Sequence, residues 1–549
     1  MTPQHGHGSS DINRGEFGAV SLYTPFLWCF LVVFAIASIP GVAFDFFPFA
    51  DAVNHVARFH ILVNAEADTQ LGVYYQSLFK INTNMGLEFL YVTLLAWLDP
   101  VLFLKFANVL IAFAMIAGTA SLGYVLNGSW RLLDLISALF VFNYALIYGF
   151  LNFSLGAGLA LLCLAAWIAL SRRNWVHAAL FGALAGFVLF VTHLFALGLF
   201  GLAVLCVEGQ KAITEWHRDK KLPLPRMYAV LIAFVPVTLF AALQLVPRLL
   251  GGEVAYEAAS GLRYGSLEDR LTAIVGPVLT YFSLWDIALW LALAGLGVWL
   301  IRGKHLSVCS ETRWMMIALA LLVLLMPARL MDAWGAHFRP GIFLAPVLVA
   351  SLSITSTMRP GWRAIAVCVV ALVSFRVAGV MIHNAPVARD FAALASVLDD
   401  LPPGGTLIGV FAGERQRGGA IAAGDRRLVR FQYNHATTVA TLKADLFTPS
   451  IFSRPDVHNL TVTPAFQHLD TPYLQAQLRP IFCETEDGPP APERYKAIRS
   501  YAYGWRRKFD YVLAIGGDGS TPCGGAPMTL ISQAGAFKLY RVSRSSAPR

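Results

Sequence analysis

Charged residues are scarce in this chain. Of its 549 residues only 14% are charged and 57% are hydrophobic, and the mean hydropathy is +0.59. A typical globular domain carries about 25% charged residues. A soluble fold of this size could not bury so much apolar surface in one or two cores. The composition therefore excludes a soluble protein and indicates a membrane protein.

The sequence also lacks the strict alternation of polar and apolar residues that marks the strands of a membrane β-barrel. Its apolar residues come in long runs separated by short basic loops. In hydrocarbon the backbone must satisfy its own hydrogen bonds, so such runs should be helices. We expect about 11 transmembrane helices. By residue number they are 22–46, 101–126, 132–149, 151–171, 176–192, 194–209, 227–247, 285–301, 313–327, 340–357 and 361–382. The apolar piece 87–98 is too short to span, and we expect a broken or interfacial helix there.

The net charge of +9 does not indicate nucleic-acid binding, because the basic residues lie in the loops on one side of the expected topology. They are Arg131, Arg172, Arg173, Lys211, Arg218, Lys220, Lys221, Arg226, Arg302, Lys304, Arg359 and Arg363. Positively charged loops stay in the cytoplasm. We therefore expect a cytoplasmic tail over 1–21, a membrane domain over 22–384 with an exterior first loop at 47–86, and an exterior domain over 385–549.

The exterior domain has the composition of a soluble α/β fold. Helical spacing runs over 390–401, and short apolar strands are expected at 406–411, 511–515 and 537–542. Cysteine is rare, with seven in the chain, and no CxxC or His/Cys cluster suggests a metal site. Only Cys483 and Cys523 fall in the exterior domain, where an oxidising compartment favours a disulfide between them.

Four polar residues of the first loop recur at helical spacing. Asp51, Asn54, His55 and Arg58 stand at positions i, i+3, i+4 and i+7. In a helix they would share one face and point a carboxylate, an amide, an imidazole and a guanidinium at one place beside the membrane. The alternative is an amphipathic loop helix with an ordinary solvated face.

Other polar residues lie at the same expected edge of the membrane. They are His193, Arg329, Asp332, His337 and Arg339. The alternatives are helix packing for His193 and a hydrated loop with an Arg329–Asp332 ion pair. Arginine and histidine together suit a phosphate or pyrophosphate, because arginine offers paired donors. A carboxylate among them could take a proton from a hydroxyl nucleophile. These loops predict group transfer from a lipid-linked phosphate donor.

At this point the sequence resembles a known class. A long first helix, an acidic residue soon after it, many further spans and an exterior C-terminal domain are similar to the GT-C membrane glycosyltransferases. The run Asp-x-x-Asn-His-x-x-Arg at 51–58 is similar to the Asp-Tyr-Pro-Asn-His-Leu-Ala-Arg run of a large group of bacterial membrane proteins. The segments 148–156, 192–193, 509–513 and 537–541 also resemble that group.

The resemblance implies an inverting transferase in a bacterial inner membrane with a periplasmic C-terminal domain. It would use a polyprenyl-phosphate sugar as donor and a glycan or lipid as acceptor, with Asp51 as general base. Asp51 has no acidic neighbour and Asp332 is the candidate second acid, which argues against a divalent metal. Two alternatives stay open: a transporter or ligase-like protein for lipid-linked saccharides, and a non-catalytic scaffold or sensor. A transferase needs its polar groups to converge at one end of the membrane, whereas a transporter needs a polar path through the mid-plane.

Overall fold

The computed structural model of the chain describes residues 14–250, 262–303, 306–330, 333–354, 361–411, 432–454, 457–470, 500–515 and 528–543. Some residues named above lie outside these ranges. They are Lys304, Asp332, Arg359 and both cysteines of the expected disulfide, Cys483 and Cys523. That disulfide stays a prediction.

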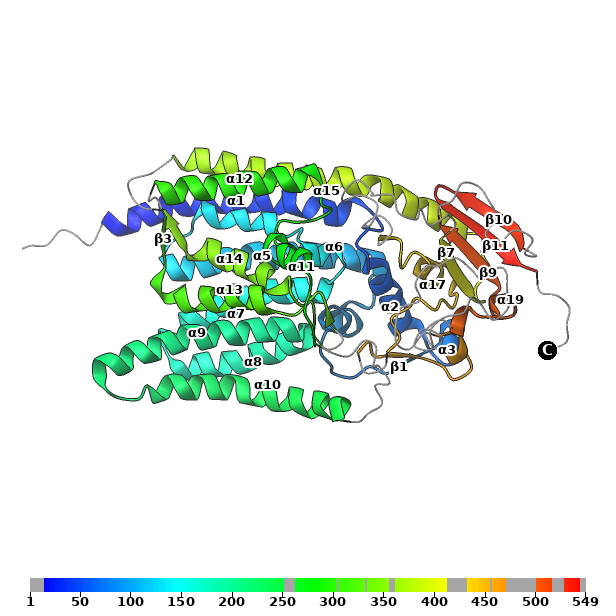
Figure 1. The fold of residues 1–549 in the computed structure, drawn as a ribbon, viewed down its shortest axis with the longest axis horizontal. Coiled ribbons are helices and arrows are strands. Elements are labelled where there is room, and N and C mark those ends of the chain that lie inside the picture. The colour runs from blue at the N-terminus through cyan, green and yellow to red at the C-terminus, as the bar shows by residue number, and fades with distance from the viewer. Residues whose placement is uncertain are drawn as a thin grey trace, which may run out of the picture.

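Within these ranges eight helices are long and apolar enough to cross a bilayer. They are α1 (Arg14–Ala43), α5 (Pro100–Asn127), α7 (Leu151–Ser171), α8 (Trp175–Thr192), α9 (Leu194–Asp219), α10 (Leu224–Leu250), α12 (Leu284–Arg302) and α15 (Trp362–Leu398). They run side by side in one bundle (Figure 1). The chain is a multi-pass α-helical membrane protein, as its composition predicts.

Three of the expected spans are shorter than a bilayer. Helices α13 (Arg313–Leu325) and α14 (Arg339–Ser351) have 13 residues each, which is about 20 Å at the helical rise. The span expected at 132–149 is a 3-10 helix, Leu132–Phe140, followed by α6 (Tyr144–Ile147). Asn143 separates these two pieces, because its side chain accepts from the Leu146 N–H and donates to the Phe140 carbonyl.

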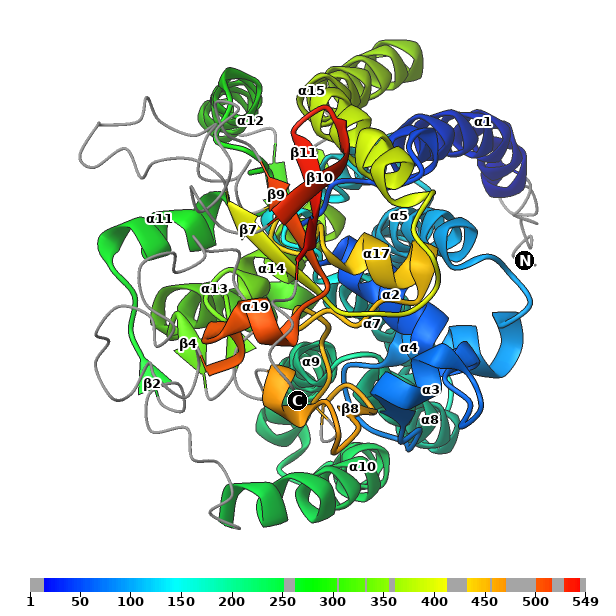
Figure 2. The ribbon, with the colours of Figure 1, turned by 90° about the vertical axis from the view of Figure 1, so that its right-hand side faces the viewer.

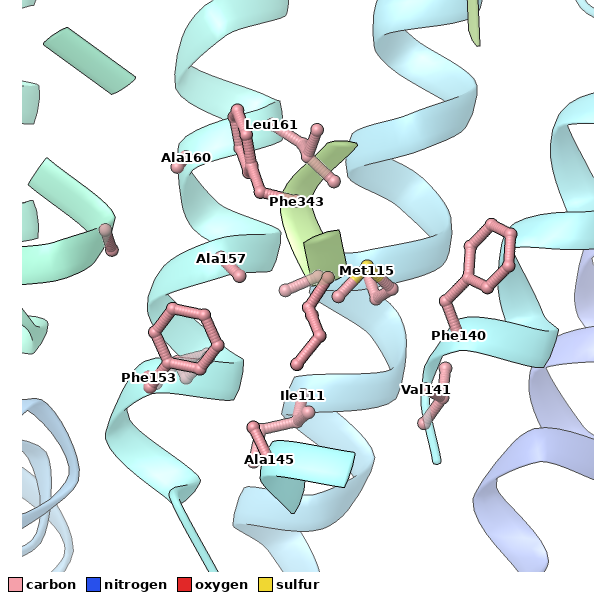
Figure 3. Packing of buried hydrophobic residues seen from close by; sticks show 14 of the residues in the cluster. Ile111, Met115, Phe140, Val141, Ala145, Phe153, Ala157, Ala160, Leu161 and Phe343 are labelled. Atoms are coloured by element: carbon pink, nitrogen blue, oxygen red, sulfur yellow. The ribbon is translucent and has the colours of Figure 1, made fainter. Parts of the chain in front are cut away.

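Small residues bring the helices at the centre of the bundle close together. A Cβ atom on Gly158 of α7 would lie 2.7 Å from the backbone of Ala114 in α5, so only glycine fits there. Around this contact Met115, Phe153 and Phe343 fill the space between α5, α7 and α14 (Figure 3). The resulting core is mostly apolar, and the start of α7 is packed within it.

One end of the bundle collects the basic loops, and we call it the basic end. Glu311 forms ion pairs with both Arg172 and Lys211, and Arg226 forms ion pairs with Glu208 and Glu215. The C-terminal domain lies at the opposite end, called here the domain end (Figure 1). The separation of basic loops from the C-terminal domain agrees with the topology expected from charge.

The C-terminal domain contains a four-stranded sheet in the order β10-β11-β9-β7. Strands β7 (Leu407–Phe411) and β9 (Tyr511–Ile515) are parallel, while β11 (Phe537–Val542) is antiparallel to both β9 and β10 (Met528–Ala534). The three expected strands are confirmed. The helix expected at 390–401 is not a separate element. It is the end of α15, which continues through Pro386 from the bundle into the domain, so the boundary expected near residue 385 falls inside a helix.

The first loop folds together with this domain. Its strand β1 (Tyr75–Ser77) pairs antiparallel with β8 (Leu460–Val462), and its helices are α2 (Ala52–Asn64) and α3 (Gln70–Tyr74). Figure 2 looks onto the domain end and shows α2 and α3 beside the C-terminal segments. The apolar piece that follows is α4 (Gly86–Leu90), which continues directly into a π-helical turn, Tyr91–Leu95. This piece is too short to span, as expected, but it is one continuous short helix and not a broken one.

The remaining short elements connect these parts. They are β2 (Leu262–Arg263), α11 (Leu267–Val275), β3 (Leu306–Val308), β4 (Arg329–Leu330), β5 (Ala333–Trp334), β6 (Leu352–Ile354), α17 (Thr438–Ala444), α19 (Trp505–Lys508) and the 3-10 turns Ser310–Thr312, Gln467–Leu469 and Ser500–Ala502. Strands β2, β4 and β5 form a small sheet at the domain end, and β3 pairs with β6 at the basic end.

Candidate functional site

Asp51 lies where the first loop meets the end of the bundle. It is the residue that precedes α2, and its backbone N–H donates to the Tyr148 carbonyl at 3.3 Å. Gly149, the residue after Tyr148, has φ +84°. A Cβ atom there would lie 2.8 Å from Cβ of Asp51, so glycine permits this close approach. The Asp51 side chain is 17% exposed. It is therefore a carboxylate that stays accessible at the domain end of the bundle.

The C-terminal domain contacts Asp51 and Asn54 directly. Nε2 of His435 lies 3.3 Å from Oδ1 of Asp51, and Nδ1 of the same ring lies 3.0 Å from Nδ2 of Asn54. Asn54 also donates to the Ser450 carbonyl at 2.6 Å and accepts from the Phe452 N–H at 3.1 Å. Half of the polar face predicted for residues 51–58 is thus turned toward the C-terminal domain.

The other half of this face is turned toward Glu88, a residue of α4. Nδ1 of His55 lies 2.9 Å from Glu88 and the Arg58 guanidinium lies 3.1 Å from it. Asn152, in the first turn of α7, donates to the second Glu88 oxygen at 2.8 Å. All four side chains are buried. Arg58 is therefore a counter-ion of Glu88 in this structure and does not present its guanidinium to a phosphate.

Burial and charge pairing act against each other on the carboxylate and the guanidinium of this cluster. Burial by itself would raise the pKa of Glu88, but the Arg58 guanidinium and His55 hold it well below its usual range. Burial lowers the pKa of Arg58, and Glu88 and then Asp51 oppose that shift. Burial, Arg58 and Arg454 lower the pKa of His458 well below its ordinary value. Glu88 is thus ionised, and its charge is balanced by Arg58. Asp51 is the more exposed of the two carboxylates.

Arg339 is a buried cation surrounded by aromatic rings. Its guanidinium lies 4.5 Å from the ring centre of Phe195, 4.9 Å from that of Phe150 and 5.4 Å from that of Phe153. It donates to the Trp334 carbonyl at 3.2 Å, while its Nε is buried and makes no hydrogen bond within the described residues. No carboxylate of the described ranges forms an ion pair with Arg339. Within the described residues, Arg339 is thus held by three aromatic rings and one backbone carbonyl.

The remaining predicted residues are placed around Arg339 or near it. Nδ1 of His193 accepts from the Phe195 N–H at 3.1 Å, and the His193 ring packs edge-on against Phe153 at 5.4 Å. His337 is buried, and its Nε2 lies 3.9 Å from Asp269. Burial lowers the pKa of His337, and Asp269 opposes that shift. Arg329 lies on β4, paired in register with Arg263 and Trp334.

One short segment of the chain touches all three groups. The Tyr148 carbonyl binds Asp51, Asn152 binds Glu88, and the rings of Phe150 and Phe153 cover Arg339. These residues form the turn before α7 and its first helical turn. Predicted site residues from separate loops therefore meet around the start of one helix, at the domain end of the bundle.

Sequence reasoning missed Glu88, His435 and the partner role of Asn152. Glu88 carried a usable signal, because an isolated carboxylate in an apolar run is expensive unless it has a role. His435 carried none, since its partners are distant in the sequence. No group of three or more His, Cys, Asp or Glu side chains in the described ranges is placed to hold a metal ion.

The chain was compared with known proteins. No family model matches it, and neither does any curated protein. Two crystal structures of ArnT from Cupriavidus metallidurans are similar over 97% of this chain and 100% of their own, at 12% identity. One is bound to undecaprenyl phosphate and has a TM-score of 0.46, and the other is in the apo state with a TM-score of 0.48. At this identity and these scores the likeness does not bear on the activity of the chain.

Proposed function

We propose that this chain is a GT-C-type membrane glycosyltransferase that moves a sugar from a polyprenyl-phosphate donor to a glycan or lipid acceptor, with Asp51 as general base. One observation carries the proposal. Asp51 is a partly exposed carboxylate at the domain end, and Glu88 beside it is already neutralised by Arg58, His55 and Asn152. A base in this position can reach a hydroxyl that arrives beside the membrane.

The proposed step is a single displacement. Asp51 takes the proton from the acceptor hydroxyl as its oxygen forms a bond to the anomeric carbon of the sugar. The bond from that carbon to the phosphate oxygen breaks, the configuration inverts, and polyprenyl phosphate leaves with the electron pair. Arg339, which has no carboxylate partner in the described ranges, would hold the phosphate of the bound donor.

The placement of charge supports a transferase over a transporter of lipid-linked saccharides. Among the described residues, the ion pairs that involve the spanning helices lie toward the two ends of the bundle. Asp286, at the start of α12, pairs with Arg376 near the domain end, and Glu208 pairs with Arg226 near the basic end. A transport path would need such groups across the mid-plane. A scaffold or sensor would need no accessible carboxylate at all.

The proposal places the chain in a bacterial inner membrane with the domain end in the periplasm. A reporter that is active only outside the cytoplasm should work when fused after Arg389 and fail when fused near Lys220. These positions lie in α15 at the domain end and at the end of α9 at the basic end. Enzymatic activity of both fusion series, normalised to protein level, measures the orientation. The reverse pattern would place the site in the cytoplasm and overturn the proposal.

Arg339→Gln should raise the KM for the lipid-linked donor by about 10- to 100-fold, the cost of losing a hydrogen bond to a charged group. The kcat should change less, because Asp51 is untouched. Kinetics of the purified protein with donor extracted from membranes measure both constants. Arg263→Gln, at an exposed arginine of β2 near the same end, is the control. An unchanged KM in folded Arg339→Gln protein would remove Arg339 from the donor site.

The central experiment identifies the donor. Lipids of a strain lacking the gene should accumulate a polyprenyl-phosphate-linked sugar, which mass spectrometry of the lipid extract reveals. Membranes of that strain hold both the donor and the unmodified acceptor, so added purified protein should consume the accumulated lipid. If no lipid-linked sugar accumulates and the added protein consumes none, the chain is not this transferase.

A further inference from the structure

The turn that precedes α17 places His435 directly against Asp51, although it belongs to the C-terminal domain. The ring is 1% exposed, and its backbone carbonyl accepts both the N–H and the hydroxyl of Thr438. The edge of the ring packs against Phe452 at 5.0 Å. His435 is therefore held firmly, with one nitrogen toward Asn54 and the other toward Asp51.

The hydrogen bonds around Asn54 determine which nitrogen of His435 carries the proton. The backbone N–H of Phe452 can only donate, so the Asn54 atom that it reaches must be the amide oxygen, Oδ1. The amide nitrogen, Nδ2, is then a donor, and it donates to the Ser450 carbonyl and to Nδ1 of His435. Because Nδ1 accepts, the proton of the neutral ring is on Nε2.

That Nε2–H faces the candidate base. It lies 3.3 Å from Oδ1 of Asp51, and it is buried without a hydrogen bond of good geometry within the described residues. Among the described residues, Arg58 on α2 and Tyr148 before α7 also interact electrostatically with Asp51.

We infer that His435 is a positioning residue of the transferase, which fixes the Asp51 carboxylate through its Nε2–H so that the second carboxylate oxygen faces the acceptor hydroxyl. The inference rests on the proposed function. It makes the C-terminal domain part of the active site: the chain Phe452–Asn54–His435–Asp51 runs from the domain backbone to the base. Neither the first loop nor the domain holds the complete arrangement alone.

The test uses full-length protein and membranes of the deletion strain as the source of donor and acceptor. His435→Ala should lower kcat by about 10- to 100-fold, the cost of a hydrogen bond to a charged group, and leave the donor KM within about twofold. His435→Gln should restore most of the loss. Its amide oxygen can accept from Asn54 and its amide nitrogen can donate to Asp51, as the imidazole does. In His435→Asn the amide is too short to reach Asp51, so this variant should behave like His435→Ala. It replaces the alanine variant in the test if His435→Ala does not accumulate.

The matched control is His60→Ala. His60 also joins α2 to the C-terminal domain, through Asp445 at 3.0 Å, but it does not contact Asp51. It should keep the wild-type kcat. If His435→Asn keeps the wild-type kcat while Asp51→Asn is inactive, or if folded His435→Gln is as slow as His435→Ala, the positioning role is wrong and the proposed function stands. If wild-type protein consumes no lipid-linked sugar, the proposed function fails and this inference fails with it.

Discussion

Asp51→Asn should lower transfer by about two to four orders of magnitude, the usual contribution of a general base. Asparagine keeps the size of the side chain and one oxygen that can accept from His435. It cannot take a proton from the acceptor. Because the backbone contact with Tyr148 does not involve the side chain, we expect normal expression and folding. The rate at which purified protein consumes the lipid-linked sugar in deletion-strain membranes measures the loss.

Asp45→Asn is the matched control for that variant. Asp45 is an exposed carboxylate between α1 and α2, paired with Lys105 on the surface, and its replacement should leave the rate unchanged. Full transfer by folded Asp51→Asn protein would contradict the mechanism. An Asp51→Asn protein that does not fold would instead assign Asp51 a structural role.

Glu88→Ala should lower the free energy of unfolding by about 3–5 kcal/mol, because it leaves the buried Arg58 guanidinium without its counter-ion. Replacing both partners with apolar residues, as in Arg58→Met with Glu88→Leu, should recover much of that loss, since no buried charge remains. Unfolding of the detergent-purified variants, followed by fluorescence, measures both effects. Asp399→Asn is the control, because Asp399 pairs with Lys443 on the surface, where an ion pair contributes about 0–1 kcal/mol.

The same pair fixes the sign of one pH dependence. The pKa of Glu88 is depressed in the folded protein, so its stabilising contribution is complete above its unfolded pKa of about 4.3 and is lost as the pH falls through the lower folded value. The part of the stability that comes from the Arg58–Glu88 ion pair should therefore be complete from pH 5 to 8, and a Glu88→Ala comparison made in a His55→Gln background isolates it from the neighbouring imidazole. In that background, a difference in stability that disappeared well above a pH of about 4.3 would mean that Glu88 is not held ionised by Arg58.

Local pattern was enough to predict much of the fold. The span 151–171 and the strands 511–515 and 537–542 have the predicted bounds, because each is a mostly apolar segment whose length decides its type. The helical face at 51–58 was predicted from spacing alone, and α2 has it. These features depend on neighbours a few residues away.

Features that depend on distant residues could not be predicted. Whether Asp51 faces His435, or Arg58 faces Glu88, is decided by how the first loop packs on the domain and on α4. Nor did the pattern show that α15 passes through Pro386. Proline removes one backbone hydrogen bond, and contacts along the rest of the helix outweigh that loss. The burial of Arg58 against Glu88 could not be predicted either, because Glu88 is 30 residues away in the sequence.

The helix α15 runs without interruption from the bundle to the sheet and connects them rigidly. Its 37 residues extend for about 55 Å, and each residue advances the helix by about 100°. A single inserted residue in its second half would therefore turn everything beyond it by more than a quarter of a revolution. A flexible linker would absorb such an insertion without effect. Here such a rotation would move the sheet out of line with the first loop, against the contacts that hold His435 beside Asp51.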